Sequence, residues 1–169
     1  MAKKTDLFAN KFYGTVTESA ANTLTFAEIP TNVDVFAKKA WVLHKLEWYQ
    51  PPADRGLIVN SDDAIRLALC SSNKLPALAL GDAGVIDLFE LNAIPYSAIG
   101  TPIYNQPHLR DFSSLPGGGL IIAPRPLYIA VQGVSIAQVA HGAVRGYFTA
   151  VDLNADEYLE LVDFYRIVQ

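Results

Sequence analysis

The stretch FSSLPGGGLIIAPRPLYIAVQG at residues 112–133 contains three consecutive glycines, followed by an apolar run that Pro-Arg-Pro at 124–126 interrupts. A phosphate-binding loop would need a Lys-Ser/Thr pair that opens a helix after the glycines, but Leu-Ile-Ile follows them instead. A membrane-spanning helix would need about 20 uninterrupted apolar residues, which the two prolines and the arginine prevent. The stretch therefore predicts a glycine-rich turn, a buried strand, a rigid corner and a second buried strand. We expect the chain to pass from one sheet to another at that corner.

Outside this stretch, short segments of alternating or continuous apolar residues, bounded by turn residues, are typical of strands. Eight strands are predicted, at Thr23–Ile29, Ala40–Gln50, Ile65–Ser71, Val85–Ile94, Pro107–Phe112, Gly119–Ala123, Leu127–Val134 and Ala143–Leu153. Eight short strands with long irregular connections and no Asn-Gly or Asp-Gly hairpin turns predict an all-β protein, an eight-stranded jelly-roll β-sandwich.

Strict alternation along the longest aromatic strand, Ala40–Gln50, assigns its side chains to two faces. One face would carry Trp41, Leu43, Lys45 and Glu47, and the other Val42, His44, Leu46 and Trp48.

Asn154–Gln169 is the one long segment with a clear helical pattern. Asn154 is a favourable N-cap residue, and Glu157 three positions later completes a capping box. An apolar face follows at helical spacing, formed by Tyr158, Leu161, Val162, Tyr165 and Val168. A shorter helix around Asn32–Lys39 is a further hypothesis.

The 169 residues predict one domain at 23–153, with a flexible N-terminal arm at 1–22 and the C-terminal helix at 154–169. Two early lysines have no apolar segment behind them, so the arm does not resemble a secretory signal. Charged residues make up 18% of the chain, below the usual 25% or so, which favours surface hidden by self-assembly. The net charge of −4 argues against sequence-independent binding of nucleic acid.

No combination of residues predicts catalysis, a cofactor or a bound metal. His44, His108 and His141 lie in different predicted elements, whereas zinc sites usually include a close pair of ligands. The chain has no Gly-x-Ser-x-Gly motif, and its single cysteine, Cys70, alternates with apolar residues as a packed thiol would. We therefore expect no catalytic residue, no cofactor and no enzyme activity.

Asp152-x-Asn154-x-Asp156 begins like a calcium-binding loop. The sixth position of such a loop needs glycine for its sharp turn, and Glu157 occupies it here. Helix capping explains these residues without a metal.

The aromatic residues allow an alternative function, because rings stack on sugars and β-sandwiches are common lectin scaffolds. A carbohydrate-binding sandwich, such as a virion spike or a host-recognition module, could use Trp41, Trp48, Tyr49, Tyr96 and Tyr104. Aromatic residues at strand spacing are more often found in the core or at a subunit interface.

Two segments, LPGGGLIIAPRPLYIAVQG at 115–133 and VRGYFTAVDLNADEYLEL at 144–161, together with the strand pattern over 23–153, resemble a single jelly-roll capsid protein of an icosahedral virus. The likeness is one of pattern and includes no diagnostic motif. It implies strands B to I in the order of the eight predicted segments, forming two sheets, BIDG and CHEF. It also implies a structural coat protein whose copies assemble into an icosahedral shell, with other capsid proteins as further partners. Assembly would take place in the host cytoplasm, and the mature protein would reside in the virion.

One feature departs from that family. Small viruses of this fold usually have an Arg/Lys-rich N-terminal arm, whereas residues 1–22 contain three lysines, Asp6 and Glu18. Direct contact with nucleic acid is therefore expected to be weak or absent. The arm is instead expected to contact neighbouring subunits. The candidate interface residues are Arg125 at the Pro-Arg-Pro corner and the aromatic residues Phe8, Phe12, Tyr13 and Tyr104.

Overall fold

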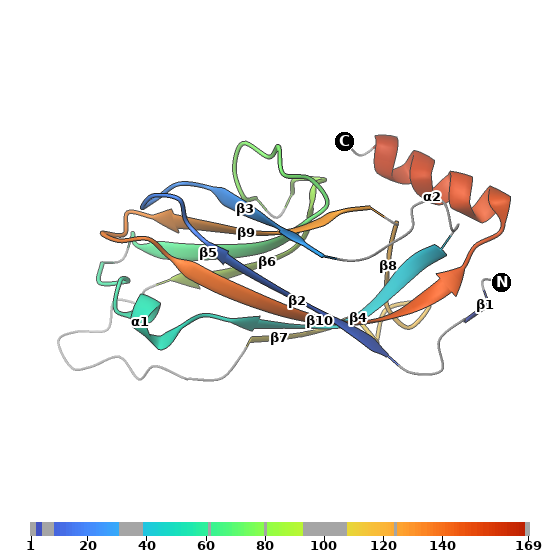
Figure 1. The fold of residues 1–169 in the computed structure, drawn as a ribbon, viewed down its shortest axis with the longest axis horizontal. Coiled ribbons are helices and arrows are strands. Elements are labelled where there is room, and N and C mark those ends of the chain that lie inside the picture. Colours follow the sequence, from blue (N-terminus) through green and yellow to red (C-terminus); the bar gives the residue numbers. More distant parts are fainter. Residues whose placement is uncertain are drawn as a thin grey trace.

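The computed structural model describes residues 3–4, 9–30, 39–60, 62–79, 81–92, 108–123 and 125–167 (Figure 1). Within these ranges two antiparallel β-sheets pack face to face, and one longer helix lies at the end of the chain. The predicted β-sandwich is confirmed.

Sheet A is built around its two longest strands, which pair with each other at its centre. These are β10 (His141–Asp152) and β4 (Lys39–Tyr49). On the outer side of β10 lie β1 (Lys3–Lys4) and β2 (Asn10–Thr17), and on the outer side of β4 lie β7 (His108–Asp111) and β8 (Leu120–Ile122).

Sheet B contains four antiparallel strands. Their order across the sheet is β3 (Thr25–Ile29), β9 (Leu127–Val134), β5 (Ala64–Cys70) and β6 (Val85–Asn92). The corner at residues 123–126 connects β8 of sheet A with β9 of sheet B, as predicted.

All eight predicted strands have a counterpart, but their predicted grouping into sheets is wrong. The grouping placed Thr23–Ile29 and Ile65–Ser71 in one sheet with Ala143–Leu153, whereas β3 and β5 lie in sheet B and β10 lies in sheet A. Because β2 was not predicted, the strand letters were assigned from β3 onwards.

Strand β2 lies within the segment predicted as a flexible arm, so sheet A includes residues from 10 to 17. Its inward positions are Phe12, Gly14 and Val16, and its outward residues are exposed. A Cβ at Gly14 would come within 2.8 Å of Ile29 Cγ1, so a glycine is needed where the two sheets approach. That glycine interrupts the apolar alternation, which is why the pattern did not reveal the strand.

Strand β4 contains a bulge that reverses the predicted faces. Leu43 pairs with Phe148 and Lys45 pairs with Tyr147, so His44 is an extra residue on β4. The buried large side chains before and after the bulge are Trp41, Leu43, Leu46 and Trp48. The predicted separation of Trp41 from Trp48 onto opposite faces is therefore wrong.

The main core lies between the two sheets. Its central aromatic cluster joins Trp41, Phe12 and Phe148, with ring centroids 4.0 Å apart for Trp41 and Phe148 and 6.1 Å apart for Phe12 and each of the others. Apolar residues of sheet B complete the core, including Ile65, Leu67, Leu69, Ile129 and Val131.

Two turns are joined at the end of the sandwich where β2 and β9 finish. The buried Glu18 carboxylate accepts hydrogen bonds from the backbone N–H groups of Thr23 (3.1 Å), Gly133 (2.6 Å) and Ala140 (2.8 Å). Asn22 exchanges two hydrogen bonds with the backbone of Ile136, both at 2.9 Å. These contacts hold the β2–β3 turn against the β9–β10 turn.

Two helices accompany the sheets. The short α1 (Pro52–Arg55), which was not predicted, follows β4, and α2 (Ala155–Ile167) follows β10. The predicted capping box of α2 is confirmed, because Asn154 Oδ1 accepts from Glu157 N at 2.8 Å and the Glu157 carboxylate accepts from Asn154 N at 3.1 Å. The predicted helix at Asn32–Lys39 lies outside the described residues except for Lys39, which begins β4. No helix in the described ranges has the length and apolar character needed to cross a membrane.

Candidate interaction surface on sheet A

The outer face of sheet B is covered by its own chain. Leu78 and Leu75, from the segment between β5 and β6, pack with Ala68, Cys70 and Ala130 into a second small core. Leu78 is only 2% exposed. In Figure 1 this segment is the green loop above β9. None of the large hydrophobic side chains described on the sheet B strands is exposed.

The outer face of sheet A is covered only near one end. There Leu161 of α2 packs with Leu153 against Ala40, Val42 and Val151. The rest, which we call the open face, is formed by outward side chains of β2, β10, β4 and β7. It comprises Lys11, Tyr13, Thr15, Ala143, Arg145, Tyr147, Lys45, Glu47, Tyr49, Leu109 and Asp111.

Large apolar side chains are exposed on the open face. Tyr13 is 58% exposed, Leu109 51% and Tyr49 44%. Protein surfaces of this kind, with aromatic residues accessible beside a few polar groups, are typical of contact sites for other molecules.

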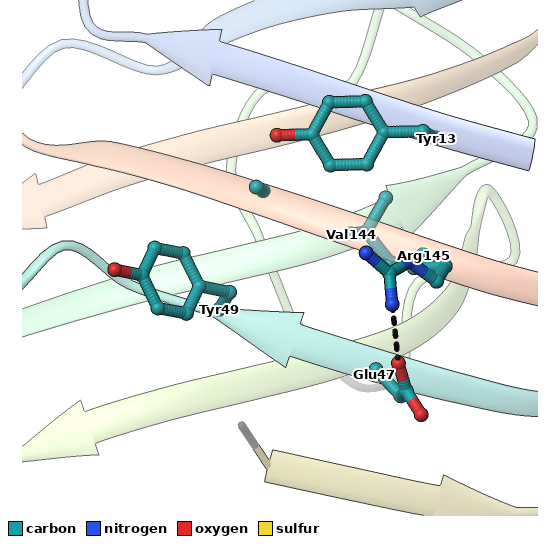
Figure 2. A pocket seen from close by; sticks show the side chains of 6 residues that line it. Tyr13, Glu47, Tyr49, Val144 and Arg145 are labelled. Atoms are coloured by element: carbon teal, nitrogen blue, oxygen red, sulfur yellow. Dashed lines mark hydrogen bonds and ion pairs between the residues drawn. The ribbon is translucent and has the colours of Figure 1, made fainter. Parts of the chain in front are cut away.

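A hollow of about 190 Å³ lies at the centre of the open face (Figure 2). The strand register aligns Tyr13 of β2, Arg145 of β10 and Glu47 of β4 in one row across the sheet. In the next row the short side chain of Ala143 lies beside Tyr49. Because a small residue on the central strand is flanked by long side chains, the surface is depressed there. The lining residues are Tyr13, Glu47, Tyr49, Ala143, Val144 and Arg145.

Polar contacts fix one side of the hollow. The Glu47 carboxylate lies 3.1 Å from Lys45 Nζ and 3.5 Å from an Arg145 guanidinium nitrogen, and it accepts a hydrogen bond from the Tyr147 hydroxyl at 3.3 Å. The hydrogen bond from Lys45 is the largest cause that lowers the pKa of Glu47, so this group is an anion at neutral pH. Exposed ion pairs contribute little to folding stability, but here they set the shape of the rim.

The edge of the open face is attached to sheet B through a buried carboxylate. Asp87 on β6 accepts a hydrogen bond from Trp48 Nε1 at 2.8 Å and forms an ion pair with Arg110 Nε of β7 at 3.4 Å. The ring of His108 on β7 stacks on Phe89 of β6, with centroids 4.8 Å apart. Burial raises the pKa of Asp87, opposed by the Trp48 hydrogen bond and the Arg110 charge. Strand β7 is therefore anchored by contacts that cross between the sheets.

The predicted interface residues lie in different environments. Tyr13 is exposed on the open face, whereas Phe12 is 6% exposed and belongs to the core, so its assignment to a surface is wrong. Arg125 is half-buried and is not among the residues that line the hollow. Phe8 and Tyr104 lie outside the described residues.

Several residues of the open face were not among the interface residues predicted from the sequence. Arg145 and Tyr147 alternate with Val144, Gly146 and Phe148 in the sequence, so a signal for their common face existed. The outward position of Glu47 and Tyr49 follows from the bulge at His44, which the sequence pattern does not indicate.

Two of the five aromatic residues predicted for sugar binding are buried. Trp48 is 1% exposed and Trp41 6%, and both belong to the core. Tyr49 is exposed, while Tyr96 and Tyr104 lie outside the described ranges.

The residues with catalytic or metal-binding chemistry are dispersed. His44 bonds to the Gly118 carbonyl at 2.8 Å and the Thr149 hydroxyl at 2.9 Å, and His141 pairs with Asp54. Cys70 is buried as predicted, and burial is the main cause that raises its pKa to about 12. In the part of the chain that the structure describes, no three His, Cys, Asp or Glu residues are arranged to hold a metal.

Comparison with known proteins adds no relative: no protein-family model matches the chain, and no curated protein matches its sequence.

Proposed function

We propose that this chain is a structural subunit that self-assembles into a closed shell, as a single jelly-roll capsid protein of an icosahedral virus does. The observation that carries the proposal is the open face of sheet A, which has exposed tyrosines and leucine beside paired charges.

The strand order supports the jelly-roll part of the proposal. With β2 counted as strand B, and β7 and β8 taken together as strand G, the order across sheet A is B, I, D, G. The order across sheet B is then C, H, E, F, with β3 as C and β6 as F. This assignment replaces the one based on the sequence pattern.

The chemistry of the open face supports contact with a neighbouring subunit. Tyrosine supplies a large contact area with few rotatable bonds, and it is enriched at interface hot spots. The charges Lys11, Lys45 and Arg145 are nearly balanced by Glu47 and Asp111, so a second copy of this acidic protein would not be repelled there.

Copies of the chain are the proposed principal partners, with other capsid proteins as additional ones. The site of action would be the virion, after assembly in the host cytoplasm. Direct binding of nucleic acid is not part of the proposed mechanism, since the chain carries a net charge of −4.

Size-exclusion chromatography combined with negative-stain microscopy tests the proposal. The wild-type protein is expected to form closed particles over some range of salt and protein concentration. The double variant Tyr13→Ser/Tyr49→Ser should remain folded and lose these particles, whereas Leu159→Ser, which alters an equally exposed side chain on α2, should retain them. A wild-type monomer under all conditions would contradict self-assembly.

A carbohydrate-binding module is the second candidate, favoured by the two tyrosine rings that flank the hollow. The hollow is smaller than the roughly 300–1,000 Å³ of typical small-molecule sites, which favours a side chain over a sugar as its occupant. Binding on a glycan array that is lost in Tyr49→Ser, without any particle formation, would establish this function in place of assembly.

A further inference from the structure

Val59 is the most exposed of the large hydrophobic side chains that the structure describes, with 76% of its surface accessible. It follows α1 in the connection to β5. The two preceding residues, Leu57 and Ile58, pack against the main core. The chain is thus anchored immediately before the point where it presents an apolar side chain to solvent.

The backbone at Val59 and Asn60 is held by hydrogen bonds to Asp63. Its Oδ2 atom accepts hydrogen bonds from the backbone N–H of Val59 (2.9 Å) and of Asn60 (2.7 Å), and from Asn60 Nδ2 (3.2 Å). The Asn60 backbone hydrogen bond is the largest cause that lowers the pKa of Asp63, so the acceptor is charged at neutral pH. A loop that is ordered before association loses little entropy on binding.

The hollow on the open face has the size of a receptor for one such side chain. Its volume is about 190 Å³, below the range of typical small-molecule sites. Its walls include the rings of Tyr13 and Tyr49, and Ala143 also lines it. Val59 is not among the residues that line the hollow of its own chain.

The charges around the two features are complementary. Val59 is followed closely by the exposed Asp62, whereas the Asp63 carboxylate is buried and hydrogen-bonded within the loop. On the open face three cations outnumber two anions, although the chain as a whole is acidic. An acidic loop that approaches this surface would be attracted to it.

We propose that the hollow on the open face receives Val59 of a second copy of this chain. The inference rests on the proposed self-assembly and specifies its contact: two different surfaces meet, so the interface is heterologous. Repetition of such a contact generates a ring when the rotation closes, which is the arrangement that a shell vertex requires.

Crosslinking between two differently labelled variants tests this contact. One preparation carries Val59→Cys and the other Thr15→Cys, an exposed position that pairs with Ala143 next to the hollow. The native Cys70 is buried and its pKa is raised to about 12, so a short bismaleimide reacts with the introduced thiols. We expect crosslinks between the two variants after mixing and co-assembly, and none within either preparation alone.

The outcomes separate this inference from the proposed function. Particles that form normally but crosslink Thr15→Cys to itself would indicate a face-to-face interface, which would overturn the inference and leave self-assembly standing. If Leu115→Cys, an exposed position in another loop, crosslinks to Thr15→Cys in the particles as efficiently as Val59→Cys does, the inference is likewise overturned and self-assembly still stands. If no particles form and no crosslink appears, both proposals fail.

A substitution pair provides a second measurement. Val59→Lys removes the apolar side chain and places a cation beside Arg145, on a face where cations already outnumber anions, and should raise the protein concentration needed for half-assembly by about tenfold or more. Leu115→Lys is the matched control and should change that concentration less than about twofold, since this residue lies outside the contact. Equal effects of the two variants would contradict the assignment of Val59.

Discussion

The outer faces of the two sheets differ in what covers them. Sheet B carries Ala68, Cys70 and Ala130 on its outer side, and the chain itself covers them with Leu75 and Leu78. Sheet A carries Tyr13, Tyr49 and Leu109, which remain exposed. Small residues on the two central strands of sheet B create space for a covering segment, whereas large residues on sheet A already fill a surface that another molecule could contact. The difference separates a face that stabilises the fold from a face available for association.

The largest expected effect concerns the thiol beneath the cover of sheet B. The pKa of Cys70 is raised from 9.0 to about 12, so the reactive thiolate is rarer than in the unfolded chain by about a thousandfold. Maleimide labelling of the native protein near neutral pH should be slower than labelling in denaturant by a factor of this order. Rapid labelling of the native protein would show that the cover opens readily.

Removal of a side chain from the cover should destabilise the fold. Leu78→Ala deletes a side chain that is 2% exposed and is expected to lower the free energy of unfolding by about 2–4 kcal/mol. The same substitution on the open face, Leu109→Ala, should lower it by less than about 0.5 kcal/mol, because Leu109 is 51% exposed. Denaturant titration of both variants measures the difference, and similar losses would remove the distinction between the faces.

The attachment of β7 to sheet B should give a pH-dependent signature. Because the pKa of Asp87 is raised, the folded state binds its proton more tightly than the unfolded state, and the wild type loses stability from this group as pH rises. The amide introduced by Asp87→Asn does not titrate. The stability of this variant relative to the wild type should therefore improve as the pH rises from about 4 to about 7, as measured by denaturant titration at each pH.

Asp111 offers a control of opposite sign. Hydrogen bonds from Ser113 lower its pKa, so its contribution to stability is present above the unfolded pKa and is lost on acidification. Asp111→Asn should therefore become less stable relative to the wild type as pH rises. If both variants changed in the same direction, the burial of Asp87 would not explain its effect.

The smallest effect on folding is expected on the open face. Tyr13→Ala and Tyr49→Ala should each change the free energy of unfolding by less than about 0.5 kcal/mol, because both rings are largely accessible. Their effect should appear in the concentration dependence of assembly, measured by light scattering. Losses of stability comparable to that of Leu78→Ala would show that the open face belongs to the fold of the subunit.

Strands were predictable from the sequence where one pattern of apolar residues continues along the whole strand. Leu127–Val134 agrees with its predicted bounds because it is apolar on both faces and ends at clear turn residues. The capping box at Asn154 and Glu157 was equally predictable, since both partners lie within one helical turn.

The errors arose where tertiary packing changes the local pattern. Gly14 occupies an inward position because Ile29 approaches it, a contact with a different strand that no local alternation can indicate. The bulge at His44 shifts the phase of β4, so Glu47 and Tyr49 reach the same face as Arg145 and Ala143 only in the folded sheet. The open face was therefore missed for the same reason as the topology: it is defined by register between strands.

The hydrogen bonds by which Glu18 and Asn22 join the two turns can form only after most of the intervening chain has been synthesised. Glu18 and the Ala140 N–H that it binds are 122 residues apart, and β2 finds its partner only in β10. At about 5–20 residues per second, a ribosome needs roughly 6–24 s to synthesise the intervening chain. During that time Phe12 and Val16 of β2 cannot be buried in sheet A, because β10 has not yet been synthesised. Strand β2 is thus synthesised well before its partner β10, and its lysine and glycine residues disfavour aggregation while it is unpaired.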